Sequence, residues 1–112
     1  MKIDFNAFEE KHHDRFKGGE GVFHQRMVED DACKIMRGML QAGSSLGEHT
    51  HEGDYEVVYI VSGAATMIFD GVPEELSAGD CSYCPEGHTH RLMNTGDEDL
   101  IFFAVVPKTA GM

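Results

Sequence analysis

The stretch 43-GSSLGEHTHEGDYEVVYIVSG-63 decides the fold of this 112-residue chain. His49 and His51 are two residues apart, so on a β-strand both side chains project from the same face. Residues 52–55 are rich in turn formers and would reverse the chain. Glu56 then opens the next strand and brings its carboxylate back beside the imidazoles. Two imidazoles and a carboxylate that converge predict a site for a metal of intermediate hardness, namely Mn, Fe, Co, Ni or Zn.

A second stretch, 79-GDCSYCPEGHTHRLMN-94, supplies a further candidate ligand. Its first residues read as a strand that runs into Pro85-Glu86-Gly87, a turn signal with a fixed φ and a permissive glycine. His90 follows the turn as the third imidazole of the predicted site.

The two stretches resemble the paired sequence motifs of the cupin superfamily. The first family pattern is G(x)5HxH(x)3–4E(x)6G and the second is G(x)5PxG(x)2H(x)3N. Every signature position is filled, and the spacer between the motifs is short, as in compact single-domain members. The resemblance covers residues 43–94 and implies an all-β, double-stranded β-helix (cupin or jelly-roll) barrel. It also implies one divalent transition metal per chain, held by His49, His51, Glu56 and His90.

The other histidines are weaker candidates for metal ligands, because seven histidines in 112 residues must include some that bind no metal. His12 and His13 lie in a run of charged residues and are interpreted as part of a solvated face. His24 is isolated, and its role stays open. His88 shares strand parity with His90 but lies in the turn region, so we expect it near the site rather than among the ligands.

Composition limits the possible partners. Nine basic and twenty acidic residues give a formal charge of −11, which argues against binding nucleic acid or an anionic membrane surface. An anionic small molecule is still compatible, since a bound divalent cation inverts the local field. No apolar run approaches the ~20 residues of a membrane span, and the first residues lack the apolar core of a signal peptide. We expect a cytoplasmic protein.

The chain divides into three predicted parts: an N-terminal segment (1–21), a single barrel domain (22–107) and a tail (108–112). Aromatic residues at roughly helical intervals predict a short helix over residues 4–17, and an extended arm is the alternative. From residue 22 the pattern is β, as many short runs separated by turn residues indicate. The predicted strands are 22–28, 33–41, 46–51, 56–61, 64–69, 72–76, 80–84, 88–94 and 100–106.

Cys81 and Cys84 form a C-x-x-C pair, which invites a zinc or redox interpretation. Residues three apart on a strand face opposite sides, however, so a shared metal is disfavoured. Packing of each cysteine as a small hydrophobe is the preferred interpretation.

Strand parity predicts what surrounds the metal. If Glu56 points inward, Val58 and Ile60 do so too, which gives a largely apolar pocket around a polar mouth. The opposite face of this strand and both faces of residues 100–106 are also apolar, and such strands are covered on both sides. The cover could be the second sheet, the N-terminal segment or another subunit. Small cupins are often dimers through such a face, and we predict a homodimer.

Three histidines and one glutamate leave coordination positions open on a five- or six-coordinate ion, which is typical of a catalytic rather than a closed structural site. The expected ligand is a small molecule with adjacent oxygens, such as a hydroxy, keto or sugar acid. The catalytic acid or base is not determined by the sequence. Candidates for it are Tyr59, Tyr83, His88, His24 and Glu48, of which Tyr59 is disfavoured by parity. Candidates for binding a substrate carboxylate are Arg26, Arg37 and Arg91, with Arg37 slightly preferred.

Three functional hypotheses follow. The preferred one is a metal-dependent enzyme of lyase or decarboxylase, isomerase or dioxygenase type. The alternative is a sensor or carrier that binds a small ligand through the metal without chemistry, and it is suggested by the brevity of the chain. A purely structural metal is the third and weakest hypothesis, because a stabilising site need not stay open. The sequence does not determine the metal, the substrate or the reaction.

Overall fold

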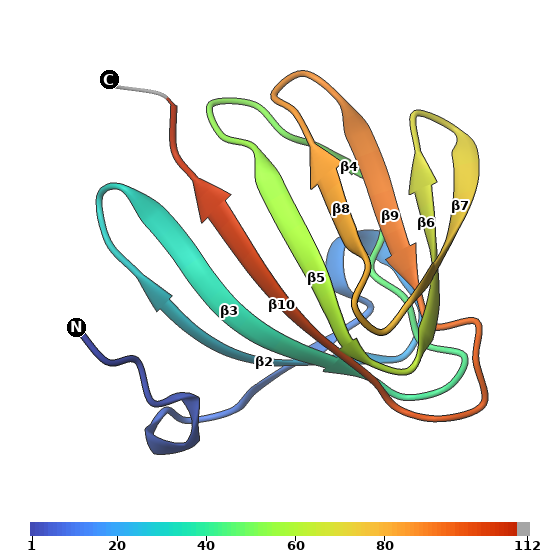
Figure 1. Cartoon of the computed structure of the whole chain (residues 1–112), viewed down its shortest axis with the longest axis horizontal. Coiled ribbons are helices and arrows are strands. Elements are labelled where there is room, and N and C mark those ends of the chain that lie inside the picture. Colours follow the sequence, from blue (N-terminus) through green and yellow to red (C-terminus); the bar gives the residue numbers. More distant parts are fainter. Residues whose placement is uncertain (110–112) are drawn as a thin grey trace.

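The computed structural model describes residues 1–109, which form two antiparallel sheets that face each other in a jelly roll (Figure 1). The larger sheet has six strands in the order β1-β2-β3-β10-β5-β8, and the smaller has four in the order β4-β9-β6-β7. The predicted all-β fold class is confirmed. The strands are β1 (Lys11–Asp14), β2 (Val22–Glu29), β3 (Cys33–Leu40), β4 (His49–Thr50), β5 (Glu56–Ser62), β6 (Ala64–Phe69), β7 (Val72–Ser77), β8 (Cys81–Cys84), β9 (Thr89–Met93) and β10 (Leu100–Pro107).

The core lies between the sheets and is built by alternation along each strand. On β10, every second residue from Leu100 is buried, and the residues between them are half-buried. This period of two is what a pleated strand with one face on a core requires. The largest fully buried side chains come from both sheets: Phe102, Leu40, Ile60, Met67 and Leu100.

The strand expected over residues 46–51 is shorter than predicted, because the chain changes hydrogen-bond partners there. The N–H of Leu46 donates to the carbonyl of Leu92 (2.9 Å), whereas the N–H of Gly47 donates to the carbonyl of Phe16 (2.8 Å). Only His49 and Thr50 pair regularly with β9. The other predicted strands are found within one or two residues of their expected ends.

The helix predicted over residues 4–17 does not form, and the alternative, an extended arm, is correct. The arm contains a 3-10 turn, η1 (Phe5–Ala7), then β1, then a second turn, η2 (Phe16–Gly18). Its aromatic residues pack against opposite faces of the large sheet. Phe5 packs edge-on against Phe103 outside the barrel (6.3 Å between ring centroids), and Phe16 packs against Phe23 inside it (5.2 Å). One straight helix could not reach both faces.

The outer face of the large sheet is therefore covered in part by the N-terminal arm. Further along the same sheet, Tyr59, Val61 and Tyr83 remain 44%, 50% and 58% exposed. No helix among residues 1–109 is long and apolar enough to cross a membrane.

The two cysteines of the C-x-x-C pair lie on opposite sides of β8, as strand parity predicted. Cys81 is exposed and Cys84 is buried. Burial raises the pKa of the Cys84 thiol to about 11, so this side chain packs as a neutral hydrophobe.

Of the predicted tail, residues 110–112 lie outside the described part of the chain. Lys108 donates from Nζ to the Glu29 carboxylate (2.7 Å), and the N–H of Thr109 donates to the carbonyl of Gly53 (2.8 Å). The boundary between arm and barrel at residue 22 stays a prediction.

Candidate metal centre

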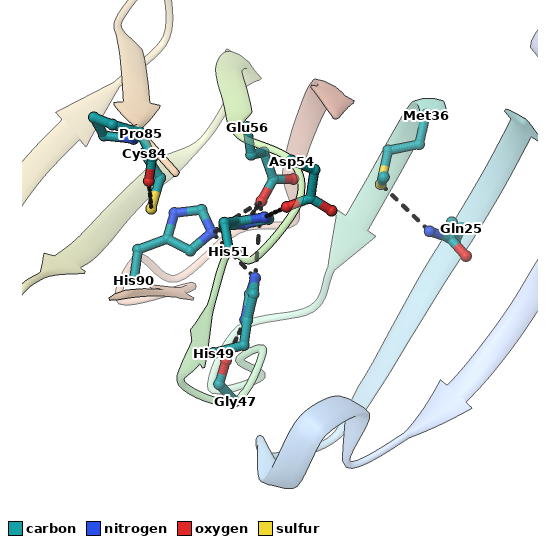
Figure 2. Close-up of polar contacts among 10 residues, drawn as sticks. All are labelled: Gln25, Met36, Gly47, His49, His51, Asp54, Glu56, Cys84, Pro85 and His90. Atoms are coloured by element: carbon teal, nitrogen blue, oxygen red, sulfur yellow. Dashed lines mark hydrogen bonds and ion pairs between the residues drawn. The ribbon is translucent and has the colours of Figure 1, made fainter. Parts of the chain in front are cut away.

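Four side chains from three strands and one turn converge at one end of the barrel (Figure 2). His49 lies on β4 directly opposite His90 on β9, and Glu56 is the first residue of β5. His51 follows β4, in the turn that leads to β5. The donor atoms of the four residues lie within 4.8 Å of one another. The structure thus brings together every ligand that the two motifs predict.

Hydrogen bonds behind the cluster orient two of the imidazoles. Nδ1 of His49 lies 2.9 Å from the carbonyl oxygen of Gly47, and Nδ1 of His51 lies 2.7 Å from Oδ1 of Asp54. These oxygens can only accept, so in each ring Nδ1–H donates, and when the ring is neutral Nε2 presents its lone pair to the centre. Such partners of a metal-binding histidine fix its tautomer and the direction of its ring.

The inner atoms of the four side chains face one another at short range. Nε2 of His90 lies 3.0 Å from Nε2 of His51 and 3.1 Å from Nε2 of His49. Oε1 of Glu56 lies 2.9 Å from Nε2 of His90 and 3.1 Å from Nε2 of His51. Two donors that each lie about 2.1 Å from one ion, at right angles, are separated by roughly 3.0 Å. The cluster therefore fits a divalent first-row metal, in agreement with the predicted cofactor, and the identity of the metal is left open.

Electrostatics keep Glu56 ionised. Its burial alone would raise the pKa, but the imidazoles of His49, His51 and His90 outweigh burial and hold the Glu56 pKa well below its ordinary value. Burial would likewise lower the pKa of His51, but hydrogen bonds to Glu56 and Asp54 raise it overall. Without a metal, the cluster is stabilised by a proton on an imidazole next to the carboxylate.

Metal-free protein is expected to be most stable between about pH 5 and about pH 6.5. The lowered pKa of Glu56 adds stability that is present above its unfolded value of about 4.3 and is lost as the pH falls through the folded pKa. The raised pKa of His51 adds stability that is complete below about 6.5 and is lost as the pH rises through the folded pKa. Urea midpoints of chelator-treated protein between pH 3 and pH 9 would check this. A midpoint that does not change with pH would contradict it.

A cavity of about 410 Å³ adjoins the cluster. Strands β2, β3 and β10 and the turn η2 supply an apolar wall, and polar groups are set into it. Gln25 is buried, and Figure 2 shows its side chain directed at Met36. Its amide nitrogen lies 3.3 Å from Sδ of Met36, and its carbonyl oxygen lies 2.9 Å from Nε2 of His13. The apolar lining residues are Phe16, Phe23, Met27, Met36, Leu46, Phe102 and Val106, and the uncharged or cationic polar ones include His13, Lys17, Gln25 and Lys34.

Several of these residues were missed from the sequence. His13 was assigned to a solvated face, but β1 turns it inward, where it lines the cavity beside Gln25. Lys34 lies on the inward parity of β3, two residues before the buried Met36. A signal did exist for Asp54: a carboxylate three residues after a ligand histidine, within the same turn.

The candidates for a catalytic acid or base lie away from the cavity. Tyr59 and Tyr83 are exposed on the outer face of the large sheet. Glu48 is exposed beside β4. His88 bonds to the carboxylate of Asp70 through Nδ1 (2.6 Å) on the surface. Each of these positions follows from strand parity or from the turn that carries the residue.

His24 and the candidate arginines also lie elsewhere. His24, Arg26 and Arg37 project from β2 and β3 on the outward parity and line a different hollow, outside the barrel. Arg26 donates to the carbonyl of Phe8 (2.7 Å) and so holds the arm. Arg91 donates to the carbonyl of Leu46 and to Oγ of Ser45 (both 3.0 Å), and fastens the loop before β4.

A jelly roll with a buried three-histidine, one-glutamate cluster at the barrel mouth defines the class of protein. The model of the family described as "Cupin domain" matches residues 36–106, more than half of the chain. The chain belongs to the cupin family.

Three similar proteins illustrate the relationship. An oxalate-binding protein of Thermotoga maritima is 33% identical over 96 residues, which are 80% of this chain and 79% of that protein. The crystal structure of a predicted oxalate decarboxylase from Thermotoga maritima is similar with a TM-score of 0.90 at 29% identity, over 96% of this chain and 99% of that chain. A sugar phosphate isomerase of the cupin superfamily from Silicibacter pomeroyi, at 20% identity, shares the fold with a TM-score of 0.81 over 97% of this chain and 76% of that one.

Proposed function

We propose that this protein binds a small carboxylic acid through a metal ion held by His49, His51, Glu56 and His90. The observation that carries the proposal is the cavity that opens directly from the buried cluster and bears two lysines. The names of the two Thermotoga maritima relatives support oxalate, or an acid with the same pair of adjacent oxygens, as the ligand.

Charge makes the metal a requirement for acid binding. Two lysines and three carboxylates line the cavity, so with neutral histidines its formal charge is −1. A divalent ion would change this to +1, within a chain whose overall charge is −11. An anionic ligand is therefore attracted only when the metal is present.

The shape of the cavity bears on the size of the ligand. About 410 Å³ lies in the usual range of ligand pockets, roughly 300–1,000 Å³. The apolar wall of Phe16, Phe23 and Phe102 suits a hydrocarbon substituent on the acid, and Lys17 and Lys34 suit its charged end. Oxalate is the smallest probe that tests the proposal.

A second candidate function is catalysis on the bound acid, and it rests on the position of His13. This imidazole lines the same cavity as the cluster and is oriented by Gln25, so it is placed to hold or deliver a proton. A bound metal would supply a Lewis acid that polarises the carboxylate. For oxalate, decarboxylation would convert the hydrogen oxalate monoanion to formate and carbon dioxide, with the proton ending on the formate carbon.

The experiment that tests binding is calorimetric titration of oxalate into protein loaded with Mn²⁺, with chelator-treated protein in parallel. Binding by the loaded protein alone is expected. Equal binding by both forms, or by neither, would overturn the proposal. Formate measured after incubation with oxalate separates the two functions: formate above the level given by free Mn²⁺ supports the enzyme, and its absence supports the binding module.

Lys34→Gln in the Mn²⁺-loaded protein is expected to weaken oxalate binding about 10-fold to 100-fold, because a hydrogen bond to a charged group contributes roughly 1.5–3 kcal/mol. The measurement is the calorimetric Kd. Lys11→Gln is the matched control, since Lys11 is exposed on β1 and does not line the cavity. An unchanged Kd for Lys34→Gln would show that this lysine does not contact the acid.

We also expect a homodimer through the outer face of the large sheet, where Tyr59, Val61 and Tyr83 leave apolar surface exposed. Light scattering at micromolar concentration should give twice the chain mass of 12.4 kDa. Tyr59→Lys should shift this mass toward the monomer. A monomer in the unmodified protein would contradict the prediction.

A further inference from the structure

A second cluster of metal-binding side chains lies outside the barrel, on the outer face of β1 and β2. His12 on β1 is directly opposite His24 on β2, so the two imidazoles form a cross-strand pair. Glu10 precedes His12 by two residues and shares its face. The neighbouring His13 has the opposite parity and points into the cavity. The cluster is therefore separate from the centre at the barrel mouth.

The donor atoms of this cluster converge. Oε1 of Glu10 lies 2.9 Å from Nε2 of His12 and 3.4 Å from Nδ1 of His24. All three ligand atoms lie within 4.8 Å of one another, and the two rings meet edge to face at 4.9 Å between centroids. The second oxygen of Glu10, Oε2, is 3.4 Å from Nε of Arg26. One carboxylate oxygen thus faces the imidazoles, while the other lies beside the guanidinium of Arg26.

One atom of the cluster lacks a hydrogen-bond partner. Nδ1 of His24 is buried, and no hydrogen bond reaches it from residues 1–109. Buried polar atoms in folded proteins nearly always have a partner. A metal ion between the two imidazoles and Glu10 would supply one.

We propose that Glu10, His12 and His24 form a second site for a divalent metal ion of the zinc type. Two imidazoles and one carboxylate are a known ligand set of zinc, with water in the remaining position. A hollow of about 280 Å³ adjoins Glu10 and His24 and has room for that water. Arg26 and Arg37 line the same hollow, and their charges make this site weaker than the one at the barrel mouth.

The consequence of the site concerns the arm. β1 is a four-residue strand at the edge of the large sheet, joined to the molecule by its pairing with β2. An ion that links His12 to His24 ties these two strands together. The same arm continues into Phe16 and Lys17, which line the main cavity. A metal ion at the outer site would therefore hold in place the part of the arm that lines the main cavity.

The test is the number of Zn²⁺ ions bound per chain at pH 7.5, measured by equilibrium dialysis of chelator-treated protein and elemental analysis. Two ions are expected for the unmodified chain. His12→Ala should bind one, and because His12 is exposed its loss should leave the fold intact, which circular dichroism would check. His51→Ala should retain the outer ion, so failure of the inner site does not affect this result. His88→Ala is the matched control, because His88 is another surface histidine beside a carboxylate, and it should still bind two.

Two outcomes would overturn the site. One is that His12→Ala binds as many ions as the unmodified chain. The other is that His88→Ala loses an ion in the same way, which would indicate general surface binding. The effect on the arm is tested by hydrogen exchange of the amides of residues 11–14. Zinc at the outer site should slow their exchange several-fold in His51→Ala but not in His12→Ala. Unchanged exchange in His51→Ala at saturating zinc would show that the ion does not stabilise the arm.

Discussion

His51→Ala is expected to lose the metal at the barrel mouth while the chain stays folded. His51 is held on both sides of its ring, since its Nε2 lies within 3.1 Å of both His90 and Glu56 and its Nδ1 lies 2.7 Å from Asp54. Changes of residues behind a ligand cost roughly 10-fold to 100-fold in metal affinity, so loss of the ligand itself should cost more than about 100-fold. The hydrogen bond that helps to keep Glu56 ionised is lost as well.

The measurement is the metal content of each purified variant after dialysis against a buffer of fixed free Mn²⁺, a metal chosen to report on the inner site. His88→Ala is the control, because it removes a histidine of the same motif, two residues from His90, whose side chain bonds to Asp70 on the surface. We expect His88→Ala to keep one equivalent and His51→Ala to keep almost none. Retention of full Mn²⁺ content by His51→Ala would refute the four-ligand centre.

That His49, His51 and Glu56 lie together could be predicted because it depends on local spacing, whereas His90 was placed with them by the resemblance to the second cupin motif. A period of two places His49 and His51 on one face, and a short turn returns Glu56 to them. Inward parity extended correctly from Glu56 to Val58 and Ile60, all of which are buried. The fold class followed from the same regular alternation.

The cavity wall could not be predicted in this way, because it is assembled from segments distant in sequence. Nothing near Lys34 or Gln25 indicates that β2 and β3 face the metal, since that depends on which strands are neighbours in the sheet. The structure of the N-terminal arm was the part of the fold that the sequence predicted least well. Its aromatic spacing suggested a helix, but η2 packs against the loop before β4, a contact that no local pattern contains. His13 was also predicted to face solvent, because the residues around it in the sequence are charged.

Gly47→Ala is expected to disturb both the arm and the metal centre through one added methyl group. A Cβ at Gly47 would lie 1.7 Å from the carbonyl oxygen of Lys17 and 2.3 Å from its carbonyl carbon. Both atoms are backbone, so η2 must move away. The hydrogen bond from the N–H of Gly47 to the carbonyl of Phe16 (2.8 Å) would then be weakened. Overpacking of this kind typically costs about 1–3 kcal/mol of folding free energy.

The metal centre is affected because the carbonyl of Gly47 accepts the Nδ1–H of His49. A shift of this carbonyl turns the ring of His49, and we expect the affinity for Mn²⁺ to fall about 10-fold to 100-fold, as for other residues that orient a ligand. Gly96→Ala is the control, because a Cβ there meets nothing closer than 3.4 Å. Urea midpoints and Mn²⁺ titrations of both variants would be compared. If Gly47→Ala lost stability but kept its Mn²⁺ affinity, the arm and the centre would be independent. A loss in both is expected. The backbone hydrogen bond between Gly47 and Phe16 joins η2, which lines the cavity, to the residue whose carbonyl orients His49.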